Sequence, residues 1–120
     1  MTRINCGIPP AELSNKHLLA EHREIKRIPN AINKGKFNLT GQPPTFKLGT
    51  GHVKFFYDKL LYLKNRYESL YAECQHRGFQ VTYYGSAWDQ IPEHLLQDYW
   101  PSPLDIEIVR QRIKDRTKSD

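Results

Sequence analysis

The chain has 120 residues, of which 38% are hydrophobic, so it is large enough for one compact core and too short for two ordinary domains. We therefore expect a single domain spanning residues 1–120. The formal net charge is +5, which favours a polyanionic partner such as nucleic acid, although a basic surface that serves solubility explains the charge equally well.

The hydropathy pattern argues against a membrane or secreted protein, and the positions of the cysteines and histidines argue against a metal-binding protein. Charged residues interrupt the apolar runs, so neither a membrane-spanning helix nor a signal-peptide core is expected, and no membrane partner. The two cysteines, Cys6 and Cys74, lack the spacing of a zinc site, and the five histidines are scattered. We therefore expect no metal site, and a soluble protein of the cytoplasm with reduced thiols.

The first predicted helix runs from Ser14, its N-cap, to about Ile28. Prolines at positions 9 and 10 precede it in an extended turn, and Pro29 with Asn30 ends it. Its apolar residues recur at helical spacing and form one buried stripe, made of Leu18, His22, Ile25 and Ile28. Basic residues project from another side, namely Lys16, Arg23 and Arg27. The pattern predicts an amphipathic helix with one basic face and a buried His22.

Residues 33–50 are predicted to form a long loop, because they hold glycines and prolines and have no sustained period. A second helix is expected from about Gly51, with Gly78 as its C-cap. Its apolar face follows steps of three and four residues, through Val53, Phe56, Leu60, Leu63, Tyr67, Leu70 and Cys74. The amides of the turn at 49–52 are candidates for binding a phosphate, but a plain turn at a helix start explains that segment equally well. The aromatic residues 55–57 favour core packing over base stacking.

The last predicted elements are an extended segment and a third helix. Residues 79–84 are aromatic and β-branched but have no obvious partner strand, so we expect them to be extended without forming a sheet. Ser102 and Pro103 provide an N-cap and a proline at the first helical position, ahead of an apolar stripe of Ile106, Val109 and Ile113. The predicted fold class is all-α, a compact single domain of three main helices with long irregular loops.

Four short stretches carry a resemblance to a known family. They are Thr-Arg-Ile-Asn at 2–5, His-Leu-Leu-Ala-Glu-His-Arg-Glu at 17–24 with Arg27 beyond it, Gly-His-Val at 51–53 running into Phe-Phe-Tyr-Asp-Lys-Leu at 55–60, and Ala-Glu-Cys at 72–74 with Arg-Gly-Phe at 77–79. In the same order and at nearly the same spacing, they resemble the pyrimidine-dimer DNA glycosylase and abasic-site lyase family of the phage endonuclease V type. Similarity is weaker around residues 91–92 and 98–99.

The resemblance implies a compact, mainly helical DNA-repair enzyme that removes one base of an ultraviolet-induced pyrimidine dimer and then cuts the backbone at the abasic site. It implies damaged double-stranded DNA as the partner, and neither a metal nor a cofactor. We expect a monomer, in a bacterial or phage-infected cell. The alternatives are a non-catalytic or abasic-site-specific DNA-binding protein with the same fold, and an RNA- or protein-binding helical domain. The family's phage member has a basic, aromatic-rich C-terminal segment that is missing here, so the preferred lesion stays open.

Thr2 and Glu24 are the catalytic residues that the resemblance implies. Removal of Met1 would expose the α-amine of Thr2, whose ordinary pKa of about 7.7 to 8.0 leaves far more of it neutral at pH 7 than a lysine amine at about 10.4. The amine would attack C1′ of the sugar and form an imine, and the Glu24 carboxylate would stabilise positive charge and remove a proton in β-elimination. Without the resemblance, Glu24 is better explained as a surface partner of Arg27 or Lys16.

Five further residues are expected to contact DNA: Arg3, Lys16, His17, Arg23 and Arg27. The three arginines are assigned to phosphates and to a kink in the duplex, because a guanidinium group forms bidentate bonds to phosphate oxygens. His17 matches the family's active-site helix, where it would position the sugar or a phosphate. A capping or solvent-facing histidine is the alternative for His17.

Overall fold

The computed structural model describes residues 2–119, with side chains as far as Arg116, and these residues form an all-α fold. Its α-helices are α1 (Asn15–Glu24), α2 (Arg27–Asn33), α3 (His52–Phe55), α4 (Leu60–His76) and α5 (Pro103–Ser119). A 3-10 helix, η1 (Pro10–Glu12), precedes α1, and two more, η2 (Gly85–Trp88) and η3 (Glu93–Leu95), lie between α4 and α5. The predicted class is confirmed, because α1, α4 and α5 are the three main helices and long loops connect them. Among residues 2–119, none of the helices combines the length and the apolar character needed to span a bilayer.

Local signals at the helix ends act as the sequence predicts. Ser14 caps α1, since its Oγ accepts the N–H of His17 at 3.2 Å. Ser102 caps α5 in the same way, through Asp105 N–H at 3.1 Å. Gly78 follows α4 at φ +81°, a left-handed conformation that glycine adopts without steric cost.

The first predicted helix is two helices, so the prediction of one helix from Ser14 to about Ile28, ended by Pro29 and Asn30, was wrong. Helix α1 ends at Glu24, and Pro29 lies inside the first turn of α2. A proline ring clashes with the carbonyl four residues earlier, which is that of Ile25, so the helix must break there. The first turn of a helix needs no amide donor, so Pro29 is tolerated at its new place.

The second predicted helix is also divided, into α3 and α4 with a turn at residues 56–59. Phe55 and Phe56 are 2% and 0% exposed and pack edge to face with ring centroids 5.2 Å apart. Helix α3 ends at Phe55, and both rings lie in the core at the start of the turn that joins α3 to α4. Their burial confirms that these aromatic side chains belong to the core rather than to a stacking surface.

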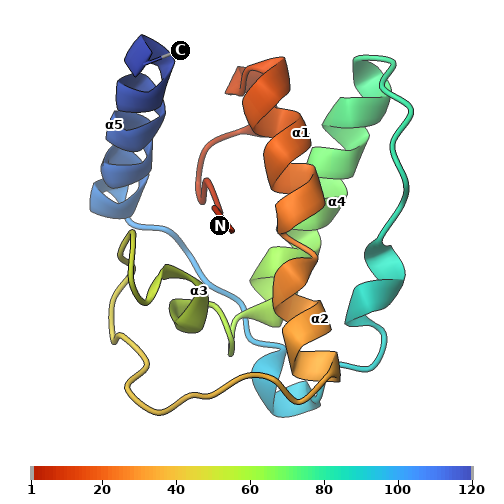
Figure 1. The fold of residues 1–120 in the computed structure, drawn as a ribbon, viewed down its shortest axis with the longest axis vertical. Helices are drawn as coiled ribbons and strands as arrows, with labels where there is room; N and C mark the ends of the chain where they lie inside the picture. Colours follow the sequence, from red (N-terminus) through yellow and green to blue (C-terminus); the bar gives the residue numbers. More distant parts are fainter. Residues whose placement is uncertain (1, 120) are drawn as a thin grey trace.

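The N-terminal segment, defined here as residues 2–8, is part of the core. In Figure 1 it runs between α1 and α5, while α1 lies against α4 and α2 against η2. Ile4 and Cys6 are completely buried, and Ile8 is 2% exposed. A segment so enclosed has a fixed place, and its first residues are therefore held at a defined position beside α1.

Candidate active site at the N-terminal segment

The backbone that follows Thr2 is bonded to the carboxylate at the end of α1. Glu24 is the last residue of α1, is 8% exposed, and its Oε1 accepts the N–H of Arg3 at 3.1 Å. One residue spans at most about 3.6 Å, so the backbone nitrogen of Thr2 lies within that distance of Arg3 N. Thr2 and Glu24 are therefore neighbours, although 22 positions separate them in the sequence.

A small cavity of about 30 Å³ opens beside this contact. Its volume suits a water molecule or one small polar group. The lining comes from the N-terminal segment, α1 and α5, and consists of Arg3, Asn5, His17, Ala20, Glu21, Glu24, Arg112, Ile113 and Arg116. Three arginines and two carboxylates thus surround a space beside the Thr2 backbone.

Arg3, which lines the cavity, has a buried donor without a protein acceptor. Its Nε is buried, and no hydrogen-bond partner for it exists among the described residues. A buried donor left without an acceptor costs about 1 to 3 kcal/mol, so such groups are usually satisfied by water or by a ligand. An oxygen-rich anion such as a phosphate would provide the acceptor that Arg3 lacks.

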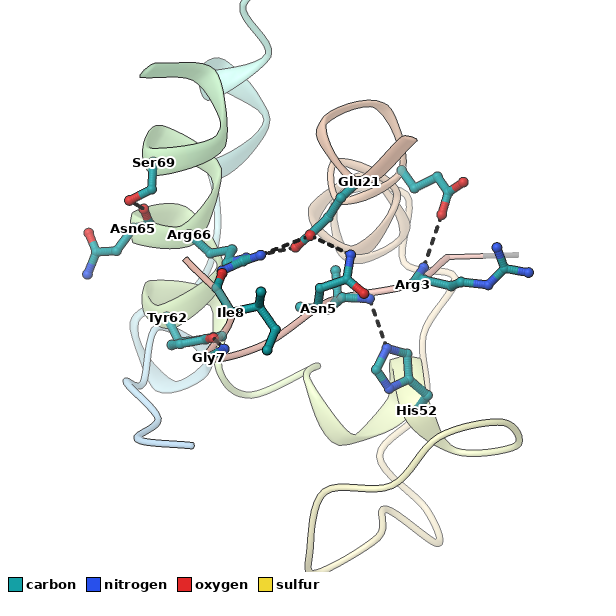
Figure 2. A network of polar contacts seen from close by, with 12 residues as sticks. Arg3, Asn5, Gly7, Ile8, Glu21, His52, Tyr62, Asn65, Arg66 and Ser69 are labelled. Carbon is teal, nitrogen blue, oxygen red and sulfur yellow. Dashed lines mark hydrogen bonds and ion pairs between the residues drawn. The ribbon is translucent and has the colours of Figure 1, made fainter. Parts of the chain in front are cut away.

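A buried network fixes the next part of the segment. Asn5 Nδ2 donates a hydrogen bond to Glu21 Oε1 at 2.8 Å. Arg66 Nε donates to the other oxygen of the same carboxylate, Oε2, also at 2.8 Å. Burial alone would lower the pKa of Arg66, but the charge and the hydrogen bonds of Glu21 raise it above its ordinary value. Figure 2 shows this network between α1, α4 and the N-terminal segment. Glu21 and Arg66 therefore serve as support for the segment.

The thiol of Cys6 is another potential nucleophile near this site, but its burial makes it unreactive. It is fully buried, and burial, with a contribution from Asp105, raises the pKa of its thiol to about 12. The nucleophilic form of cysteine is the thiolate, which is scarce at neutral pH when the pKa is so high. Within the described part of the chain, no group of three or more His, Cys, Asp or Glu side chains could hold a metal ion.

The predicted DNA-contacting residues fall into two groups in space. Arg3 and His17 line the cavity. Arg23 lies at its edge, with a side chain 60% exposed and Nη2 at 3.8 Å from Glu24 Oε2. Lys16 is exposed on α1, and Arg27 lines a different pocket beside Lys34 and Lys36. Lys16 and Arg27 are thus not part of the cavity.

Two residues of the site were missed by sequence reasoning, Arg112 and Arg116 of α5. Arg112 Nη2 donates to Asn5 Oδ1 at 2.8 Å and to the carbonyl of Ile4 at 3.4 Å. Burial, followed by the nearby charge of Arg3, lowers the pKa of Arg112. Their spacing of four places both arginines on one helix face, which was the available signal. Nothing in the sequence indicated that this face meets the N-terminal segment.

The fold and the cavity define a small, basic, all-α protein in which the start of the chain, a buried carboxylate and several arginines share one site. The family model described as pyrimidine dimer DNA glycosylase matches residues 1–84. This match runs from the N-terminal segment through α4, and the chain belongs to that family. The suspected resemblance is thereby confirmed, and the family's activity implies DNA as the substrate.

Proposed function

We propose that this protein removes a base at pyrimidine dimers in double-stranded DNA and then cleaves the abasic site by β-elimination, acting as a monomer and a single domain. The observation that carries the proposal is the 3.1 Å hydrogen bond from Arg3 N–H to Glu24 Oε1, since it sets the Thr2 nitrogen beside a carboxylate. The arginine-lined cavity at the same point supports an anionic substrate.

The proposed chemistry uses the α-amine of Thr2 after removal of Met1. The neutral amine attacks C1′, the glycosidic bond breaks, and the base leaves with the bonding electrons and takes up a proton. The nitrogen then loses a proton, its lone pair breaks the C1′–O4′ bond, and O4′ takes up a proton, so the sugar opens and a protonated imine forms. Glu24 stabilises the positive charge that develops on the sugar, which a carboxylate in a partly dry site does more effectively than one in water.

The second half of the reaction is strand cleavage. Glu24 removes a proton from C2′, and the electrons form a C1′–C2′ enamine. The enamine electrons then expel O3′, so the C3′–O3′ bond breaks, the downstream strand leaves with a 5′-phosphate, and a conjugated imine remains. Water then hydrolyses the imine and frees the Thr2 amine. One carboxylate can serve both steps because charge stabilisation requires the ionised form, and so does proton removal.

The cations have two proposed tasks. Arg3, Arg112 and Arg116, with His17, bind the phosphates next to the reacting sugar, since they line the cavity. Lys16, Arg23 and Arg27 bind the duplex outside it, because their side chains lie at the edge of the cavity or beyond it. Phosphate contacts of this kind set the orientation of the duplex and carry no sequence information.

Reduction with borohydride tests the proposal, because it converts an imine into a stable amine. Wild-type protein incubated with abasic or dimer-containing duplex should give a covalent adduct, and peptide mass spectrometry should place the adduct on the Thr2 nitrogen. Glu24→Gln should bind the duplex but lose strand cleavage. The matched control is Glu12→Gln, which changes an exposed carboxylate paired with Arg110 and should cut like wild type.

Three results would contradict parts of the proposal. Equal cleavage by wild type and Glu24→Gln would remove Glu24 from the mechanism. An adduct on a lysine would replace Thr2 as the nucleophile. Tight binding of the damaged duplex without an adduct or base release would indicate a DNA-binding protein that has the fold but not the activity.

A further inference from the structure

His52 connects α3 to the N-terminal segment through both ring nitrogens. Nε2 accepts the N–H of Ile4 at 3.0 Å, and Nδ1 lies 2.9 Å from the carbonyl oxygen of Lys47. A carbonyl only accepts, so the ring hydrogen is on Nδ1, and Nε2 must be without one in order to accept from Ile4. Both contacts are satisfied only by a neutral imidazole in this tautomer. The ring faces the segment directly in Figure 2.

The local backbone puts His52 at this place. Gly51, the N-cap of α3, has φ +93°, a conformation that residues with a Cβ rarely adopt. A Cβ at Gly51 would also come within 2.9 Å of Pro43 Cγ. The glycine before His52 therefore permits the turn that directs the imidazole inward.

The surroundings of His52 are apolar. The residue is 4% exposed, and its ring meets Phe46 and Phe56 edge to face, with centroids 5.5 and 5.4 Å apart. An apolar side chain would fill this space but leave the fully buried Ile4 without an acceptor for its N–H. A histidine therefore supplies a hydrogen-bond acceptor for the Ile4 N–H at this position, which a hydrophobic residue would not.

The contact lies two residues after the proposed nucleophile. Three elements hold this stretch of backbone: α1 through Glu24 on Arg3 N–H, α3 through His52 on Ile4 N–H, and α5 through Arg112 on the Ile4 carbonyl. His52 is absent from the cavity lining, so it acts on the site through the backbone. We propose that His52 is a positioning residue, whose neutral ring fixes Ile4 and so keeps the Thr2 nitrogen beside Glu24. The inference rests on the proposed function.

The electrostatics of the site agree with a neutral ring. Burial lowers the pKa of His52, the Lys47 carbonyl opposes this shift, and Arg112 from α5 lowers the pKa further. Glu21 from α1 acts in the opposite direction, and the resulting pKa stays below the ordinary value of 6.5. The ring therefore keeps its acceptor at the neutral and mildly basic pH where an α-amine is available as a nucleophile.

Two substitutions separate positioning from simple packing. His52→Leu fills the space without an acceptor, whereas His52→Gln keeps a side-chain oxygen that can accept from Ile4 N–H. The measurement is the rate of borohydride-trapped adduct at saturating abasic duplex, together with the dissociation constant for the same duplex. A displaced reacting group costs up to about 100-fold, so the leucine variant should react roughly 10- to 100-fold more slowly with little change in affinity. The glutamine variant should recover most of the rate.

A second histidine provides the matched control. His22 of α1 is 3% exposed and hydrogen bonded to the Tyr67 hydroxyl at 3.2 Å, but within the described residues it forms no hydrogen bond to the N-terminal segment. His22→Leu should lower the melting temperature and leave the adduct rate at saturating duplex within about twofold of wild type, since the loss is one of packing and a single hydrogen bond. Amide hydrogen exchange at Ile4 should accelerate in His52→Leu and stay slow in His52→Gln and His22→Leu.

The outcomes distinguish this inference from the function on which it rests. Absence of an adduct with wild type would overturn the proposed function and the role of His52 with it. An adduct in wild type and an equal rate in folded His52→Leu would overturn only the role of His52. Nitrogen chemical shifts of the wild-type ring give an independent test, because a hydrogen on Nε2 at pH 7 would also overturn it.

Discussion

Arg66 of α4 and Glu21 of α1 form a two-pronged ion pair inside the protein, with Nε at 2.8 Å from Oε2 and Nη2 at 3.0 Å from Oε1. Their side chains are only 6% and 1% exposed. The pair joins α1, the helix that carries Glu24, to α4, and it also provides the acceptor for Asn5. The position of the N-terminal segment therefore depends on an electrostatic contact in the core.

Substitution of Arg66 in this pair should strongly lower the free energy of unfolding. Arg66→Met leaves the Glu21 carboxylate buried without its counter-ion, and the expected loss in free energy of unfolding is about 3 to 5 kcal/mol, measured by urea denaturation. The matched control is Arg110→Met, which breaks the exposed pair between Arg110 and Glu12. The control should shift the urea midpoint far less, because solvent screens exposed charges. Equal losses in the two variants would contradict the structural role assigned to Arg66.

Stability should decrease in mild acid because two buried histidines are neutral in the folded protein. Burial lowers the pKa of both His52 and His22, so their folded-state values lie below the unfolded value of 6.5. As the pH falls below about 6.5, the unfolded chain takes up protons that the folded chain does not, and stability is lost. The melting temperature should therefore fall by several degrees between pH 6.5 and pH 5, before most carboxylates titrate.

Variants identify the source of that acid sensitivity. His52→Gln should show a smaller difference in melting temperature between pH 7 and pH 5 than wild type, since one of the two contributing groups is gone. Substitution of the exposed His94 by glutamine should reproduce the wild-type profile, because solvent surrounds this residue in the folded protein. A profile for His52→Gln as steep as that of wild type would show that this imidazole does not stay neutral.

Binding of duplex DNA should weaken steeply as salt increases. Each phosphate neutralised by a protein cation contributes about 0.9 to the slope of log affinity against log salt. Arg116→Gln removes an exposed cation at the cavity and should lower that slope by about 0.9 without a large loss of stability. Arg110→Gln, on the same helix but paired with Glu12, is the control and should leave the slope as in wild type. Unchanged slopes in both variants would place Arg116 outside the DNA contact.

Sequence reasoning succeeded where the signal was local. Ser14, Ser102 and Gly78 mark helix ends through bonds that span only a few residues, and such patterns can be read directly from the chain. The breaks within the first two predicted helices were missed. In one, a proline acts on the carbonyl four residues upstream. In the other, the apolar spacing continues through the turn, because Phe56 is buried like the helical residues around it, so the spacing gives no sign of the break.

The site depended more on tertiary contacts and was predicted less completely. Thr2, Arg3, His17 and Glu24 were named through the family resemblance, since a carboxylate at the end of a basic helix has no distinctive local pattern. His52 and Arg112 act on Ile4 across 48 and 108 positions of sequence. The spacing of residues along a helix gives no information about contacts between positions so far apart in the sequence. Neither residue was therefore assigned a role from the sequence.

The burial of residues 2–8 against α5 has a consequence for how this protein is made. The proposed reacting nitrogen is at the end of the chain that leaves the ribosome first, yet Ile4 bonds a residue that is translated 108 positions later. The contact of Arg3 with Glu24 needs only α1, but the Ile4 carbonyl and Asn5 Oδ1 receive Arg112 only after α5 has formed. The full set of contacts that holds residues 2–8 therefore forms late in folding, after α5 has docked against the segment.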